Sequence, residues 1–289
     1  MSSPRLGFAF SSAFSADRLP AIARATERAG LDDLWVWEEG FKSAGIASAA
    51  IALAATNRIS VGIGVTPAPV RNVSLLAMEL ATLARAHPGR LIAGLGSGAG
   101  SWPGQAGDRT ASHLTLMREY ATALRALLDG ETVTAEGRYV KLEDVALRFP
   151  PTQQVPLLLG GGGPKALALS GELGDGTILS LALPSTAVGD ATRTARAASS
   201  ASDDHPVVAT LIVATGRDGS KRAEQAATAW RPTADETSWA AGDAAAIAAG
   251  ITRLANAGAT SIELVPTPDE TDIEELIRVL GNDVRPLIS

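Results

Sequence analysis

Short apolar runs alternate with helical patterns from one end of the chain to the other. The apolar runs predict eight β-strands, at residues 6–10, 33–37, 59–65, 90–94, 156–159, 176–180, 207–213 and 261–265. Between them, apolar positions at helical spacing predict helices, at residues 17–29, 43–55, 74–86, 112–128, 164–173, 185–201, 220–230, 243–257 and 269–280. The chain therefore reads as repeated strand-and-helix units.

The repeated unit is visible at both ends of the chain. Helical patterns close on Ala-Gly at residues 29–30 and again at 257–258, and an apolar strand follows each closure. Glycine just past a helix end suits the left-handed cap position. Eight units over 289 residues favour a (β/α)8 barrel in one domain, residues 1–289, with a doubly wound open sheet as the alternative.

Two segments interrupt this rhythm. Residues 131–151 predict a small hairpin insertion before the fifth strand. Residues 182–204 are rich in Ala, Ser and Thr and predict a weakly packed helix and loop. Neither segment has the composition of a linker between domains.

Composition narrows the function classes. Hydrophobic residues make up 46% of the chain and aromatic residues 4%, so small aliphatic side chains must fill the core. A net charge of −6 without a basic run argues against nucleic-acid binding. The absence of cysteine excludes disulfides and thiolate chemistry and is compatible with the cytoplasm. The longest apolar run, residues 44–55, is too short to span a bilayer, so we expect no membrane partner.

The start of the chain, residues 1–16, weakly resembles a secretory signal, but Ser11 and Ser12 interrupt its apolar stretch. We therefore interpret residues 6–10 as a first strand.

Four glycines follow the fifth predicted strand and precede a helical pattern. Bare glycine backbone at a helix start leaves N–H groups free to bind an anion, and a lysine in the first turn adds positive charge. This segment predicts a phosphate site. The alternative is that the glycines only allow a tight backbone turn and bind no ligand. The residues concerned are Gly161, Gly162, Gly163, Pro164 and Lys165.

Other polar and glycine-rich segments follow the second and fourth strands, at the end where a barrel builds its site. Glu38 and Glu39 are adjacent, so at most one should face the mouth, where it could act as an acid, a base or a hydrogen-bond anchor. A solvated surface pair is the alternative. Residues 94–99 match a dinucleotide fingerprint, but no helix begins inside the match, which favours a glycine floor beside a flat ligand.

The histidines carry little signal. His87, His113 and His205 lie far apart without metal-ligand spacing, so we predict no metal site. Only His113 lies on the expected mouth side. Trp102, in the loop after the fourth strand, could wall an apolar pocket or simply pack.

Several segments together resemble a known family. Residues 54–65 (AATNRISVGIGV), 78–83 (MELATL) and 89–96 (GRLIAGLG) look like the bacterial-luciferase-like flavin oxidoreductases. Residues 162–167 (GGPKAL) and 171–176 (GELGDG) resemble its deazaflavin-dependent branch. The similarity extends through nearly the whole chain.

The resemblance implies a (β/α)8 barrel that binds its cofactor at the mouth. The family's phosphate would lie on the turn after the fifth strand, in agreement with the anion argument above. A non-proline cis peptide, common in the family at the third strand, maps to Gly64–Val65. The residues implied beside the ring are Gly64, Val65, Thr66, Gly96, Ser97 and Gly98.

One departure concerns the second strand. Many deazaflavin enzymes carry Asp-His there, whereas this chain has Glu38-Glu39-Gly40. An alcohol-oxidising mechanism that relies on the imidazole is therefore in doubt, and an acidic residue would have to bind the ring or protonate a substrate.

The resemblance leads to one expectation with several alternatives. We expect an oxidoreductase that uses the 5-deazaflavin coenzyme F420 for hydride transfer to or from a small-molecule substrate, with Glu38 and Glu39 as candidate catalytic residues. An FMN-dependent monooxygenase is the close alternative, and a non-catalytic flavin-binding barrel is the second. A phosphate-binding isomerase would need an acid–base pair that the sequence does not reveal. The apolar helices are compatible with a homodimer.

Overall fold

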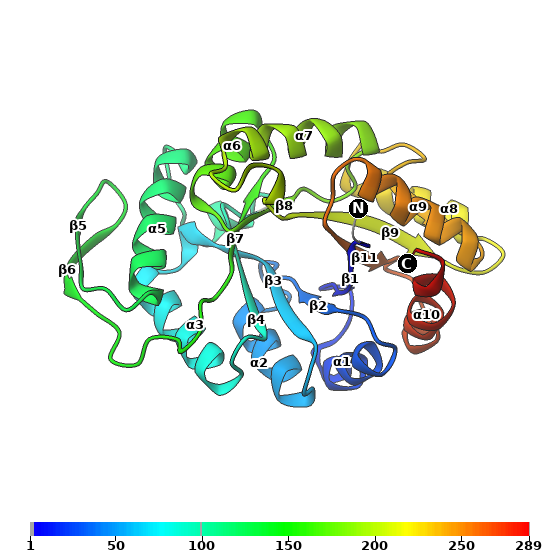
Figure 1. Ribbon diagram of the computed structural model, residues 1–289, viewed down its shortest axis with the longest axis horizontal. Helices are drawn as coiled ribbons and strands as arrows, with labels where there is room; N and C mark the ends of the chain where they lie inside the picture. Colours follow the sequence, from blue (N-terminus) through cyan, green and yellow to red (C-terminus); the bar gives the residue numbers. More distant parts are fainter. Residues whose placement is uncertain (1–2, 99, 289) are drawn as a thin grey trace.

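Eight parallel strands close into a barrel in the computed structural model, which describes residues 3–98 and 100–288 (Figure 1). The pairing of β8 with β9 closes the sheet, so the predicted barrel is confirmed and the open sheet is not. In their order around the barrel, the strands are β1 (Arg5–Phe10), β2 (Asp33–Val36), β3 (Ser60–Pro67), β4 (Leu91–Gly96), β7 (Leu157–Gly161), β8 (Gly176–Leu179), β9 (Val207–Ala214) and β11 (Ser261–Pro266).

Helices surround the strands and bury their apolar stripes against them (Figure 1). Side chains of Asn72, Ser112, Asp243 and Asp272 cap four of the helix starts, as sequence preferences for caps lead one to expect. The helices are α1 (Leu19–Arg28), α2 (Gly45–Ala55), α3 (Val73–Ala86), α4 (Trp102–Gln105), α5 (His113–Leu128), α6 (Pro164–Leu173), α7 (Ser185–Ala198), α8 (Gly219–Trp230), α9 (Ala244–Asn256) and α10 (Ile273–Val279).

Shorter helical turns complete the chain. Three single 3-10 turns lie at Ala16–Arg18, Ala68–Val70 and Ser202–Asp204, and a π-helical stretch, Leu280–Val284, continues α10 into a last turn, Arg285–Leu287. The Ala-Gly closures also form as expected, because Gly30 and Gly258 have φ angles of 75° and 103°. No helix in the described ranges has the length and apolarity that crossing a bilayer requires.

The predicted insertion is a two-stranded hairpin, β5 (Val133–Glu136) and β6 (Lys141–Val145), which projects beyond α5 at the left of Figure 1. The carboxylate of Glu119 on α5 accepts hydrogen bonds from the amides of Arg138, Tyr139 and Val140, at 3.0, 2.8 and 3.1 Å. One side chain thus holds the hairpin turn against the barrel.

The helix and loop predicted at residues 182–204 are present, but the prediction that the helix is weakly packed is wrong. Most of this segment forms α7, which buries Val188, Ala191 and Ala195. A Cβ atom at Gly171 of α6 would overlap the carbonyl of Ala195, so the two helix backbones are in close contact. Small side chains here allow tight packing, although their polarity and size suggested the opposite.

Glycines let a single large side chain fill the barrel interior. The indole of Trp35 lies across the barrel. A Cβ atom at Gly7 would lie 2.6 Å from its nearest ring atom, and a Cβ atom at Gly62 would lie 2.4 Å from its nearest ring atom. Trp35 packs there with Leu158 and Val208. These side chains form the floor beneath the strand ends at which a barrel site is built.

Helix α8 has an unexpected place. Its Ala223, Ala226 and Ala227 cluster with Ala9 and Val265, whose alternation along β1 and β11 turns them to the interior. α8 therefore packs beside β9 and β10 (Trp239–Ala241), and its alanines join the interior layer at the mouth end of the barrel. The sequence missed β10, which pairs with the end of β9.

Candidate functional site

The glycine turn after β7 remains open to solvent. Gly162, Gly163, Pro164 and Lys165 are exposed, and a Cβ atom built on Gly163 meets nothing within 4 Å. Within the described residues no side chain caps the start of α6, which leaves first-turn amides for another acceptor. The turn therefore has the open, amide-rich geometry that an anionic group requires.

A hydroxyl missed by the sequence stands beside this turn. A Cβ atom at Gly162 would lie 3.0 Å from the Oγ of Ser180, which directly follows β8. Because β7 and β8 are neighbours in the barrel, their ends share one edge. The predicted order of the strands was the signal that could have paired Ser180 with the glycine turn.

The third strand carries the expected irregularity. The Gly64–Val65 peptide is cis, as the family resemblance implies, and the pairing with β4 shifts register between Ile63 and Thr66. Gly64 and Val65 are partly exposed, whereas Thr66 is only 2% exposed. Of these three predicted ring-side residues, Gly64 and Val65 are the more accessible to a ligand.

The glycines of the fourth strand have a packing role. A Cβ atom at Gly96 would lie 2.5 Å from Cγ2 of Val65, and one at Gly160 would lie 3.2 Å from Cγ1. Both glycines thus make room for the Val65 side chain. Ser97 and Gly98 are partly exposed, and Gly98 has a φ angle of 81° against Pro103.

Glu38 is tied into the wall of the mouth. Its side chain is 9% exposed and accepts hydrogen bonds from the Gly45 amide at 3.0 Å and from Nη1 of Arg71 at 3.0 Å. Arg71 also pairs with Glu79 at 3.3 Å. Glu38 therefore anchors the start of α2 as well as the loop after β3.

Glu39 faces the other way, as expected for its neighbour on an extended chain. It accepts hydrogen bonds from the Ser12 hydroxyl and from Nζ of Lys42. Burial would raise the pKa of the Glu39 carboxyl, but the hydrogen bonds from Lys42 and Ser12 hold it below its usual value. Glu39 is thus an ionised carboxylate at the rim, and it is more exposed than Glu38.

Two aromatic rings meet above this rim. Phe41, which is 78% exposed and has a φ angle of 63°, lies edge-on to Trp102 with ring centroids 6.3 Å apart. A Cβ atom at Gly40 would overlap the Trp102 indole, so glycine is required there. Trp102 thus packs against the backbone at Gly40, and its role as the wall of an apolar pocket stays a prediction.

A buried carboxyl was overlooked by the sequence analysis. Glu263 on β11 is 2% exposed, and burial raises its pKa to about 7, although the hydrogen bond from Trp37 opposes this rise. The Nε1 of Trp37 donates to its Oε1 at 2.5 Å. An acidic residue inside a strand whose two faces are both buried was the available signal.

The three histidines do not assemble into a site. His205 is 1% exposed, its Nε2 lies 2.9 Å from the Thr177 hydroxyl, and burial together with Arg196 lowers its pKa. His87 follows the end of α3, and His113 is the first residue of α5. Across residues 3–98 and 100–288, no three His, Cys, Asp or Glu side chains group as metal ligands.

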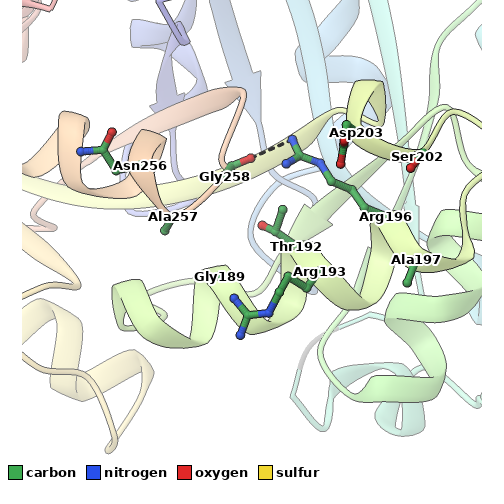
Figure 2. A pocket seen from close by; sticks show the side chains of 10 residues that line it. All are labelled: Gly189, Thr192, Arg193, Arg196, Ala197, Ser202, Asp203, Asn256, Ala257 and Gly258. Carbon is green, nitrogen blue, oxygen red and sulfur yellow. Dashed lines mark hydrogen bonds between the residues drawn. The ribbon is translucent and has the colours of Figure 1, made fainter. Parts of the chain in front are cut away.

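A surface pocket of about 400 Å³ lies away from these residues (Figure 2). It is lined by the C-terminal turns of α7 and α9, which precede β9 and β11 and so lie at the barrel end opposite the mouth. Its arginines are engaged: Arg193 pairs with Asp190, and Arg196 donates to the Gly258 carbonyl at 3.1 Å. We therefore separate this pocket from the candidate site.

Comparisons with known proteins identify relatives of the chain. The chain is 32% identical over 168 residues to the 5,10-methylenetetrahydromethanopterin reductase of Methanolobus tindarius, a match that covers 58% of this chain and 51% of the reductase. It is 30% identical over 187 residues to the F420-dependent glucose-6-phosphate dehydrogenase of Kineococcus radiotolerans, covering 60% and 56%. The chain thus spans about half the length of the curated relatives it matches.

Among solved structures, an F420-dependent secondary alcohol dehydrogenase in complex with an F420–acetone adduct has the same fold. The TM-score is 0.87 at 21% identity, with all of both chains covered. A family model described as luciferase-like monooxygenase matches residues 3–271. That match covers most of the chain, and therefore the chain belongs to the luciferase-like monooxygenase family.

Proposed function

We propose that the chain is an oxidoreductase that transfers hydride between coenzyme F420, a 5-deazaflavin, and a small organic substrate. The observation that carries the proposal is the open glycine turn with Lys165 at the start of α6, at the mouth of a luciferase-like barrel. The deazaflavin dependence printed in the names of two similar proteins supports the choice of cofactor.

The residues divide between the two ends of such a cofactor. The amides of Gly161, Gly162 and Gly163, the first turn at Pro164 and the ammonium group of Lys165 would hold the phosphate. Gly64 and Val65 would lie behind the ring, where Val65 is fixed between two glycines. Thr66, Gly96, Ser97 and Gly98 would support this ring-side surface.

When bound, a deazaflavin supplies two-electron hydride chemistry without activating oxygen. The chain then has to orient the substrate, exclude water and manage one proton. We propose Glu39 for the proton-handling role, because its carboxylate already accepts a hydrogen bond from the Ser12 hydroxyl and is more exposed than Glu38. We propose that Glu38 acts mainly through Arg71 and the start of α2.

Binding and reduction assays test this proposal. Purified protein should bind F420, with a change in its absorbance, more tightly than FMN. With an accepted substrate, Glu39→Gln should lower kcat by about 100-fold while the F420 dissociation constant stays within threefold. Lys42→Gln is the matched control for lost charge pairing at the rim. Failure of both cofactors to bind would refute the proposal, and an unchanged kcat would remove Glu39 from it.

A second candidate is an FMN-dependent monooxygenase, favoured by the description of the matching family model. It requires tight binding of reduced FMN and consumption of oxygen in step with substrate. Oxygen uptake with reduced FMN but none with reduced F420 would select this candidate.

We further propose that residues 1–289 act as one domain and pair as a homodimer. Exposed apolar side chains on adjoining helices, Ile51 on α2 with Leu75 and Met78 on α3, would supply the contact. Sedimentation of the unaltered chain as a dimer, and of Leu75→Glu as a monomer, is expected. A monomeric unaltered chain would contradict the pairing.

A further inference from the structure

Strand β11 and helix α8 hold the indole of Trp37 at the mouth end of the barrel, and a loop hydroxyl holds its backbone. Its Nε1 donates to Glu263 of β11 at 2.5 Å, and its ring stands edge-on to Trp230 of α8 with centroids 5.9 Å apart at 88°. Its backbone carbonyl accepts a hydrogen bond from the Ser43 hydroxyl at 3.1 Å. Trp37 is therefore fixed in position while one part of its surface stays exposed.

Burial of the Glu263 carboxyl group, which holds the Trp37 indole, is energetically unfavourable. It lies in the barrel interior, level with Gly7 on one neighbouring strand and Thr210 on the other. Its pKa is raised to about 7 by burial, and among the described residues Trp37 is the hydrogen-bond partner that lowers it. Burial of a carboxyl group without a cation partner is unfavourable. A side chain with that cost and a single partner points to a positioning role.

Other apolar rings and paired charges lie at the same end of the barrel. Phe41 and Trp102, from the loops after β2 and β4, stand edge-on to one another, and Trp35 fills the barrel interior together with Leu158 and Val208. The acidic residues of the rim are already neutralised, Glu38 by Arg71 and Glu39 by Lys42. A substrate in contact with this wall would meet ring faces and would find the nearby cations engaged.

We propose that Trp37 is the substrate-facing wall of the site, that Glu263 positions it, and that the substrate is an uncharged compound with a flat ring. This inference rests on the proposed function, since the substrate would bind beside the cofactor. It predicts that an uncharged ring compound binds more tightly than a sugar phosphate. A sugar phosphate would need a free cation for its own phosphate in addition to Lys165, which is assigned to the cofactor.

Binding to the chain loaded with oxidised F420 tests the inference without turnover. The probes are menadione, an uncharged flat ring compound, and glucose 6-phosphate. Menadione should bind at least tenfold more tightly than glucose 6-phosphate. Glu263→Met, which removes the acceptor at similar volume, should weaken menadione binding at least tenfold, and Glu263→Gln, which keeps an acceptor oxygen, should stay within threefold.

A second variant, Trp37→Phe, tests the same interaction in case Glu263→Met does not fold. Trp37→Phe keeps a ring but removes the indole N–H, and it should lose menadione affinity to the same extent as Glu263→Met. The double variant should lose no more than either single change, because both break one interaction. Phe149→Leu, at an exposed ring on the segment after the hairpin, is the matched control and should leave both affinities unchanged.

The outcomes separate the two proposals. The F420 dissociation constant should stay within threefold in all variants, a split that general destabilisation would not produce. Unchanged menadione affinity in Trp37→Phe and Glu263→Met, or tighter binding of glucose 6-phosphate than of menadione, would overturn this inference alone. Failure of the unaltered chain to bind F420 would overturn the proposed function and this inference with it.

Discussion

At the scale of single residues, glycine has two distinct uses in this chain. Gly7 and Gly62 make room for Trp35, and Gly96 makes room for Val65, so each is required by packing. Gly163 has open space where its Cβ would be, so packing does not require it. Gly163 is therefore a position in the turn after β7 at which the approach of a ligand explains glycine better than packing does.

Matched alanine substitutions test this distinction. Gly96→Ala should lower the free energy of unfolding by about 1–3 kcal/mol, because its new methyl group would displace Val65. Gly163→Ala should change it by less than about 0.5 kcal/mol, since its φ of −112° suits alanine. Chemical denaturation measures both. Equal losses in the two variants would contradict the assignment.

The raised pKa of Glu263 gives a second prediction at this scale. The carboxyl binds its proton more tightly in the folded state, with a pKa of about 7 against a usual 4.5. Its contribution to stability is therefore fully present below pH 4.5 and is lost as pH rises through 7. The shift corresponds to about 3 kcal/mol.

Denaturation of Glu263→Gln at two pH values measures this loss. The amide does not titrate, so the difference in unfolding free energy between the unaltered chain and the variant should shift by about 2.5 kcal/mol in favour of the variant from pH 5 to pH 8. A difference that is constant with pH would show that Glu263 titrates normally.

At the scale of elements, periodicity predicted the strands and most helices, because buried faces repeat with the period of each element. It did not predict where α8 packs. The alanines at 223, 226 and 227 form the same stripe whether a helix lies outside the barrel or on its mouth-end layer. The place of α8 depends on partners far away in sequence, among them the Leu181 carbonyl, which accepts from Nε of Arg231 at 3.1 Å.

The hairpin β5–β6 offers an element-scale test. Three of its turn amides donate to the Glu119 carboxylate. Burial would raise the pKa of this carboxyl, but the three hydrogen bonds together hold it below its usual value. Glu119→Ala should increase hydrogen exchange at residues 138–140 by about tenfold, since each lost bond to a charged acceptor is worth about 1.5–3 kcal/mol. Exchange in the barrel strands should not change, and Glu136→Ala is the control.

At the scale of the whole molecule, the barrel brings together groups that the sequence keeps apart. The predicted turn after β7 and the bulge of β3 both lie at strand ends of one barrel, as eight repeated units led us to expect. The link between Glu263 and Trp37 spans 226 residues, and no local pattern encodes such a contact. The sequence thus singled out the residues of the proposed cofactor end, whereas the contact of Trp37 with Glu263 became visible only in the fold.

The most direct test of the account compares two ligands that differ in the phosphate-bearing tail: F420 and its phosphate-free deazaflavin chromophore. The unaltered chain should bind F420 at least 100-fold more tightly. In Lys165→Ala this preference should fall at least tenfold, because a charge-assisted bond to phosphate is worth about 1.5–3 kcal/mol, and Lys141→Ala should retain it. Equal affinity of the unaltered chain for both ligands, or an undiminished preference in Lys165→Ala, would contradict the phosphate site at the start of α6.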